Sequence, residues 1–206
     1  MRVMKFGGTS VASAKRISAV ADIVREAATA GPVLVVISAM SGVTNLLRDG
    51  VQAAVEGNGT TPCLARFSEL HRSTAAELFH QDKAPLDAEL KSLENDLSQY
   101  LQGVKLLGEC PPGVMASLYS LGERASSLIL AKLLNAQCLD AASYIRTTRG
   151  SLFAAPDWKA TAQAFEKLRE NPIPISVMPG FFGADADGRI TILGRGGSDY
   201  SAAIAA

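Results

Sequence analysis

Two segments near the N-terminus predict parallel strands joined by a helix. Residues 3–6 predict a short buried strand, and apolar residues at positions 17, 20, 21, 24 and 28 follow it at helical spacing. Residues 33–37 form a continuous run rich in β-branched side chains, which is typical of a central parallel strand. This order of strand, helix and strand predicts a βαβ unit.

The middle of the chain carries a long amphipathic pattern. A polar loop at residues 38–45 and a helix over 46–55 precede it. Apolar residues then recur every three or four positions from Leu86 to Val104. This spacing predicts a helical hairpin or subdomain around residues 63–107, within a helical insertion of about 61–110. We expect this hairpin to pack against its own domain rather than form a coiled-coil dimer, because the pattern covers fewer than four heptads.

The last part of the chain alternates short strands with helices. A helix over about 115–134, interrupted near Gly122, is expected before a strand at 137–139. A helix over 157–170 is predicted with positions 158, 162, 165 and 168 facing inward, and a strand at 173–178 whose prolines favour its beginning or a sheet edge. Asp187-Gly188 predicts a hairpin turn before a strand at 189–193, rather than a calcium loop. A last helix is expected over 200–206. The predicted fold is α/β, mainly a parallel sheet sandwiched by helices.

Composition narrows the function classes. The 206 residues are 48% hydrophobic, which is enough for one substantial core, and 20 basic residues balance 20 acidic ones. This balance argues against nucleic acid or an anionic membrane as a partner. The three cysteines are widely spaced, so neither a disulfide framework nor a zinc site is expected. Without a signal peptide or a transmembrane run, we expect a cytoplasmic protein.

A glycine loop follows the first predicted strand. In Lys5-Phe6-Gly7-Gly8-Thr9-Ser10, a lysine ends the strand, two glycines allow close backbone approach, and hydroxyls precede a helix. Such a helix start attracts phosphate, and Lys5 adds a full positive charge. The loop lacks the spacing of a Walker A motif. A tight strand-to-helix turn with an exposed lysine is the alternative.

A second glycine loop, at residues 194–199, lies between a predicted strand and a predicted helix. It contains three glycines, Arg195, Ser198 and Asp199. An arginine can grip a carboxylate through two parallel hydrogen bonds. Asp199 would orient Lys5, hold magnesium through water, or cap the following helix. Both loops should open on the carboxyl edge of the sheet, where such folds bind ligands.

Four motifs together resemble the signatures of aspartate kinases, in the amino acid kinase fold. They are Lys5 to Ser10, Ser38 to Asn45, Gly122-Glu123, and Leu193 to Tyr200. Weaker matches at residues 140–154 and 180–183 extend the resemblance to nearly the whole chain. The resemblance implies ATP-dependent phosphorylation of the side-chain carboxylate of L-aspartate, the step that opens lysine, threonine and methionine synthesis. It also implies ATP with Mg²⁺ and a homo-oligomer for the full-length protein.

The resemblance also implies a role for each candidate residue. Lys5 would stabilise the transferring phosphoryl group, with Asp199 holding it in place. The phosphates of ATP would be bound by Lys5, Phe6, Gly7, Gly8, Gly196 and Gly197. Aspartate would be bound through Ser38, Thr44, Glu123, Arg195 and Ser198, with Glu123 taking its ammonium group and Arg195 its α-carboxylate.

Several of these residues have a plain structural alternative. Glu123 would be a helix-surface carboxylate paired with Arg124, and Thr44 would cap a helix. His71 and His80 have no obvious catalytic partner, and we expect a solvated or half-buried role for both.

The resemblance covers only part of what aspartate kinases contain. We therefore expect residues 1–206 to be the N-terminal portion of an amino acid kinase catalytic domain, C-terminally incomplete, with the nucleotide half and regulatory domains absent. Such a fragment should be weakly active or inactive alone. The alternative functions are another amino acid kinase or a non-catalytic aspartate-binding module.

Overall fold

Four parallel strands form the central sheet, in the order β1 (Arg2–Phe6), β2 (Val33–Ile37), β4 (Ile175–Pro179) and β3 (Gln137–Cys138). The computed structural model describes residues 1–79 and 84–206. Each strand pairs with its neighbour in parallel register, for example Val35 with Met4 on one side and Val177 on the other. The predicted α/β class with a mainly parallel sheet is confirmed.

The strand β2 lies at the centre of two hydrophobic cores. Val33, Val35 and Ile37 belong to one core, and Leu34 and Val36 to the other. All five residues of β2 are fully buried. Because successive side chains of a strand point to opposite faces, a strand covered on both faces must be apolar throughout. This explains the continuous apolar run in the sequence.

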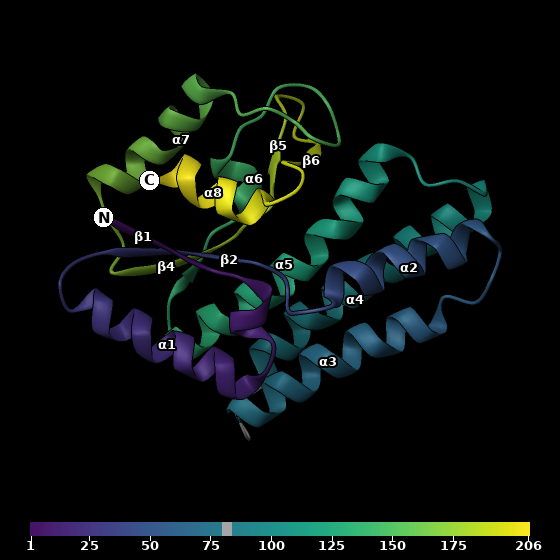
Figure 1. Ribbon diagram of the computed structural model, residues 1–206, viewed down its shortest axis with the longest axis horizontal. Coiled ribbons are helices and arrows are strands. Elements are labelled where there is room, and N and C mark those ends of the chain that lie inside the picture. Colours follow the sequence, from purple (N-terminus) through teal and green to yellow (C-terminus); the bar gives the residue numbers. More distant parts are fainter. Residues whose placement is uncertain (80–83) are drawn as a thin grey trace.

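Helices cover both faces of the sheet (Figure 1). The first core contains α1 (Ala14–Ala28), α2 (Val43–Val55) and α5 (Pro112–Leu134). The second contains α6 (Ala141–Tyr144), α7 (Trp158–Glu170) and α8 (Gly197–Ala205). A two-stranded antiparallel hairpin of β5 (Phe182–Ala184) and β6 (Ile190–Ile192) adjoins the second core, and its turn confirms the hairpin predicted at Asp187-Gly188.

The helical hairpin predicted in the middle of the chain consists of α3 (Thr61–Phe79) and α4 (Ala84–Leu107). It packs against α2 and α5 of the same chain, as expected. The apolar row on α4 that predicted the hairpin is buried, and its members are Leu86, Leu90, Leu93, Leu97, Leu101 and Val104. This inward packing favours the prediction over the coiled-coil alternative, because the row is already covered.

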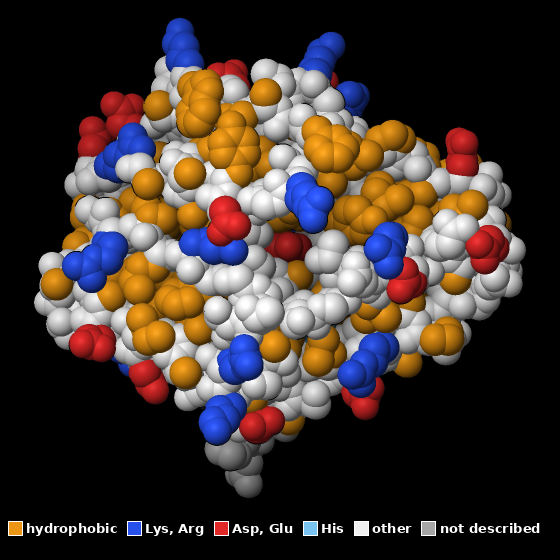
Figure 2. Space-filling model, viewed as in Figure 1, with side chains coloured by type: hydrophobic (Ala, Val, Ile, Leu, Met, Phe, Trp, Pro, Cys, Tyr) orange, Lys and Arg blue, Asp and Glu red, His pale blue; other side chains and the backbone are white. Residues whose placement is uncertain are grey.

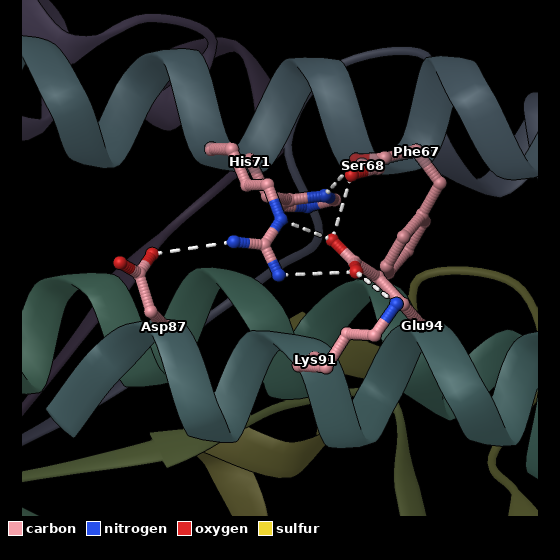
Figure 3. Close-up of polar contacts among 7 residues, drawn as sticks. Phe67, Ser68, His71, Asp87, Lys91 and Glu94 are labelled. Atoms are coloured by element: carbon pink, nitrogen blue, oxygen red, sulfur yellow. Dashed lines mark hydrogen bonds and ion pairs between the residues drawn. The ribbon is translucent and has the colours of Figure 1, made fainter. Parts of the chain in front are cut away.

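A polar cluster joins the two helices of the hairpin (Figure 3). The guanidinium of Arg72 on α3 lies 2.6 Å from one carboxylate oxygen of Glu94 on α4 and 3.3 Å from Asp87. Ser68 also donates to Glu94, at 2.7 Å. Burial alone would raise the pKa of Glu94, but hydrogen bonds from Arg72 and Ser68 outweigh it and leave the pKa below its usual value. The cluster fixes how α3 and α4 align.

The side chain of His71 is buried beside this cluster. Its Nδ1 lies 2.8 Å from the carbonyl oxygen of Phe67, and its ring centroid lies 4.4 Å from that of Phe67. Its Nε2 has no hydrogen-bond partner among the described residues. Burial lowers the pKa of His71 from 6.5 to about 4. The predicted solvated or half-buried role is therefore wrong for His71, and His80 lies outside the described residues.

Two helix starts near the carboxyl edge of the sheet and one predicted helix interruption differ from the structure. Helix α2 begins at Val43 rather than at residue 46, and α8 begins at Gly197 rather than at residue 200. Helix α5 is continuous from Pro112 through Gly122, without the predicted interruption. A glycine inside a helix weakens it, but packing decides here: a Cβ on Gly122 would lie 2.9 Å from side-chain atoms of Ala39 and Val43.

The inward faces of α7 and the place of β4 also need correction. Trp158 is 60% exposed and Ala162 is exposed, whereas Phe165 and Leu168 are buried as predicted. Thr161 takes the third inward position, because it lies one turn before Phe165 on the side that Leu168 also occupies. The strand β4 is central, so the predicted edge position is wrong, whereas the predicted alternative, prolines at the beginning of the strand, is confirmed. Its prolines are tolerated because position 174 precedes the strand and position 179 ends it.

Candidate active site

A cavity of about 280 Å³ opens where β1 and β2 end. It lies at the carboxyl edge of the sheet, where both glycine loops were expected to open. Figure 2 shows a hollow near the middle of one face, with acidic side-chain atoms visible inside it. The cavity is lined by Lys5, Gly8, Ser38, Ala39, Met40, Ser41, Gly42, Thr44, Glu123, Phe181, Gly196, Gly197, Ser198 and Asp199.

Three helix starts meet at this cavity. The short 3-10 helix η1 (Gly8–Val11) follows β1, α2 follows the loop after β2, and α8 follows the second glycine loop. The first residue of η1, the N-cap residue of α2 and the first turn of α8 all line the cavity. The free backbone amides and positive dipole ends of helices attract anions. Three helix N-termini at one cavity favour the binding of anions there.

Lys5 and Asp199 form an ion pair at the cavity. The Nζ of Lys5 lies 2.8 Å from a carboxylate oxygen of Asp199, and the two side chains are 24% and 73% exposed. Lys5 comes from β1 and Asp199 from the first turn of α8, so the pair joins the two glycine loops. The N-cap residue of α8 is Gly196, without a side-chain cap. Of the alternatives for Asp199, the geometry therefore favours orienting Lys5 over capping.

The first glycine loop lies directly against the loop that follows β2. A Cβ on Gly8 would lie 2.8 Å from the carbonyl oxygen of Ala39, a distance that real Cβ atoms do not reach. Glycine is needed here because two backbone segments approach closely. This contact places the lysine loop beside Ser38 and the residues after it.

Glu123 lies on α5 and presents a buried carboxyl group to the cavity. Glu123 is only 4% exposed, and its Oε2 has no hydrogen-bond partner among the described residues. Burial raises the pKa of Glu123 from 4.5 to about 8, although backbone amides of Ala39 and Glu123 oppose the shift. Arg124 pairs instead with Asp140, at 3.2 Å. The surface-carboxylate alternative for Glu123 is therefore wrong.

The cavity brings together most, but not all, of the residues that the sequence singled out. Nine of the twelve candidates line it. Phe6, Gly7 and Arg195 do not, and the Arg195 side chain is exposed, although the next residue, Gly196, lines the cavity. The loops that carry Lys5 and Arg195 thus meet at one cavity, but the Arg195 guanidinium does not line it.

The cavity also has lining residues for which no role was predicted from the sequence. Ala39, Met40, Ser41 and Gly42 belong to the loop after β2, and Phe181 follows β4. The signal was present, since both segments lie within the matched motifs at residues 38–45 and 180–183. Phe181 has a φ of 76°, a rare backbone conformation for a non-glycine residue.

Neither a clustered metal site nor a membrane-spanning helix occurs among the described residues. In residues 1–79 and 84–206, no three His, Cys, Asp or Glu side chains gather as a metal site would require. None of the helices in these ranges combines the length and the apolar character of a transmembrane span.

Comparisons with known proteins agree with this geometry. The family model described as the amino acid kinase family matches residues 1–206. An aspartokinase of Chlamydia muridarum is 33% identical over 207 residues, and lysine-sensitive aspartokinase 3 of Escherichia coli is 32% identical over 218 residues. The crystal structure of E. coli aspartokinase III in complex with aspartate and ADP superposes with a TM-score of 0.87 at 32% identity.

The overlap with these proteins is one-sided. The matches cover 98% and 99% of this chain but 44% and 45% of the two relatives, and the E. coli structure is covered to 46%. The chain therefore spans somewhat less than half the length of the relatives it matches.

Proposed function

Because this chain belongs to the amino acid kinase family, we propose that it serves ATP-dependent phosphorylation of the side-chain carboxylate of L-aspartate, giving 4-phospho-L-aspartate. The relatives named above are aspartokinases, and one solved relative holds aspartate and ADP. The observation that carries the proposal is the buried Glu123 carboxyl group, which has a free oxygen and shares its cavity with Lys5.

The acceptor side of the cavity suits an acidic amino acid. A buried carboxylate needs a cation, and the ammonium group of aspartate supplies one to Glu123. The hydroxyls of Ser38, Thr44 and Ser198 line the same cavity and would donate hydrogen bonds to the substrate carboxylates. Arg195 would bind the α-carboxylate from the rim of the cavity, since its side chain is exposed and it directly precedes Gly196, which lines the cavity.

The phosphoryl side of the cavity uses Lys5 and the helix starts. Phosphoryl transfer asks the protein mainly to position reactants and to stabilise charge. Lys5, held by Asp199 at 2.8 Å, would face the transferring group. Backbone amides of the Phe6-Gly7-Gly8 segment and of Gly196-Gly197 would bind the phosphates.

Magnesium would enter with ATP as part of the substrate. Mg²⁺ prefers oxygen ligands and is commonly held by one or two carboxylates together with substrate phosphates. Asp199 fits this requirement, because its carboxylate is 73% exposed at the cavity. Glu123 fits it poorly, because its pKa of about 8 leaves it mostly protonated at neutral pH.

The test is a coupled assay that traps aspartyl phosphate as its hydroxamate. Replacing Lys5 with alanine should lower turnover by at least about 100-fold, because charge stabilisation at the transferring group is lost. Lys15→Ala, which removes an exposed lysine on α1, is the matched control and should change nothing. Turnover that is indifferent to Lys5→Ala would remove Lys5 from the mechanism.

Binding measurements separate the alternatives. The chain alone is predicted to be weakly active or inactive, so titration with L-aspartate and with a non-hydrolysable ATP analogue accompanies the assay. Binding of both supports the proposal. Aspartate binding without nucleotide binding would favour a non-catalytic aspartate-binding module, and preference for another acceptor would favour another amino acid kinase.

We also propose that residues 1–206 are the N-terminal portion of an amino acid kinase catalytic domain, with residues 61–110 as a helical insertion. This is supported by the share of the relatives that the chain covers and by the α3–α4 hairpin. A cytoplasmic location and a homo-oligomeric full-length protein stay predictions.

A further inference from the structure

One buried hydroxyl joins the helix that carries Glu123 to the loop that follows β2. Ser126 lies on α5 and is completely buried. Its Oγ donates to the carbonyl oxygen of Ser38 at 2.7 Å, across 88 positions of sequence. The carbonyl of Glu123, within its own helix, is a more distant acceptor at 3.1 Å. A serine hydroxyl carries one hydrogen, so the shorter bond to the loop is the one we assign.

The peptide group of Ser38 continues this link to β1. The Ser38 backbone N–H donates to the carbonyl oxygen of Phe6 at 3.1 Å. Phe6 follows Lys5 directly at the end of the strand. A chain of hydrogen bonds thus runs from the residue beside Lys5, through both sides of Ser38, to Ser126, one helical turn beyond Glu123.

The same part of α5 also touches the loop by direct packing. Gly122 leaves no room for a side chain, since a Cβ there would lie 2.9 Å from atoms of Ala39 and Val43. Gly122 and Ser126 are four residues apart and therefore lie on one face of the helix. This face holds the loop at a fixed distance from the helix, and Glu123 lies between the two contacts.

We propose that Ser126 is a positioning residue that sets the distance between the ammonium-binding Glu123 and the carboxylate-binding loop of Ser38 to Thr44. The inference rests on the proposed function, because it assumes that aspartate bridges these two anchors. Ser126 does not line the cavity. Its effect is exerted through the Ser38 carbonyl, which would lose its donor if the hydroxyl were removed. A loop released in this way would no longer meet both ends of the same ligand.

The test compares Ser126→Ala with Ser120→Ala on the same helix. Ser120 is also buried, and among the described residues its hydroxyl donates within α5 alone, to the carbonyl oxygen of Ser117 at 2.7 Å. Both variants therefore lose one helix hydroxyl. Isothermal titration measures L-aspartate and succinate, which has the two carboxylates and lacks the ammonium group. Thermal unfolding of each variant reports its stability.

We expect Ser126→Ala to weaken L-aspartate binding about tenfold and to change succinate affinity about twofold or less. A wrong distance between Glu123 and the loop weakens only a ligand that must contact both of them, and succinate has no ammonium group for Glu123. Ser120→Ala should leave the ratio of the two affinities at its wild-type value. If Ser126→Ala does not fold, Ser126→Cys carries the test, because a thiol keeps the size and is a weaker donor. For Ser126→Cys we expect a smaller fall in the ratio of L-aspartate affinity to succinate affinity than for Ser126→Ala.

Two results would overturn the inference, and they differ from each other. A wild-type chain that prefers L-aspartate, together with an unchanged aspartate-to-succinate ratio in the folded Ser126 variants, would leave the proposed function intact and refute the positioning role. A wild-type chain that binds neither ligand, or binds succinate equally well, would overturn the proposed function and the role of Ser126 with it.

Discussion

The raised pKa of Glu123 makes aspartate binding depend on pH. With a pKa of about 8, the free chain holds Glu123 mostly protonated at neutral pH. An ammonium group binds the ionised carboxylate, so binding must remove a proton from Glu123. We therefore predict that affinity for L-aspartate rises as pH rises toward 8 and that binding releases a proton below that pH.

The size of the effect follows from the ionised fraction. A pKa of about 8 leaves about one tenth of Glu123 ionised at pH 7 and about one hundredth at pH 6. The apparent dissociation constant is the intrinsic one divided by this fraction. Affinity should therefore increase about a hundredfold between pH 6 and pH 9, which corresponds to about 2.7 kcal/mol. The slope should be about tenfold for each pH unit below 8.

Isothermal titration at several pH values measures this prediction. Repeating each titration in two buffers of different ionisation enthalpy gives the number of protons released, which should approach one near pH 6 and fall to about one half at pH 8. Succinate is the ligand control, because without an ammonium group it should show no such release. Glu123→Gln is the protein control, because it keeps the shape and should bind aspartate weakly at every pH.

Folding stability supplies an independent readout of the same group. The folded-state pKa of Glu123 lies above its ordinary value of 4.5, so the folded chain binds more protons than the unfolded chain between these values. The free energy of unfolding should therefore fall as pH rises from about 4.5 toward 8, and Glu123→Gln should lose this fall. Equal aspartate affinity at pH 6 and pH 9, without proton release, would refute the reasoning.

The remaining predictions concern the helical hairpin. Burial lowers the pKa of His71 from 6.5 to about 4, so the contribution of the neutral imidazole to folding stability is complete above pH 6.5 and is lost as pH falls toward 4. His71→Leu should remove about 3 kcal/mol of this pH dependence of the free energy of unfolding, measured by denaturant titration. An unchanged pH profile would contradict the lowered pKa of His71. Leu97→Ala should lower the free energy of unfolding by about 2–5 kcal/mol, whereas Leu106→Ala, at a position that is 88% exposed on the same helix, should stay within about 0.5 kcal/mol; equal losses would show that α4 does not pack as described.

Patterns of apolar spacing predicted the strands and helices that line the core. The run of residues 33–37 predicted β2, and the row from Leu86 to Val104 predicted the buried face of α4. These predictions succeed because burial on both faces, or on one helical face, imposes a period that a single sequence displays.

The starts of α2 and α8 were predicted too far along the chain, because the N-cap residues of both helices are glycines. Sequence reasoning looks for Ser, Thr, Asp or Asn before a helix. The N-cap residues of α2 and α8 are instead Gly42 and Gly196, with φ values of 87° and 71° and without a side-chain cap.

The α/β fold, the two glycine loops and the group of motifs that resemble aspartate kinases could be predicted from the sequence, because local spacing and residue type carry that information. The packed structure was needed to show that Glu123 is buried, that Asp199 pairs with Lys5, and that Arg195 does not line the cavity. It was also needed to show that Ser126 bonds Ser38. Burial, the pKa shift that follows from it, and contacts across 88 or more positions depend on how distant segments pack, which neither spacing nor composition expresses.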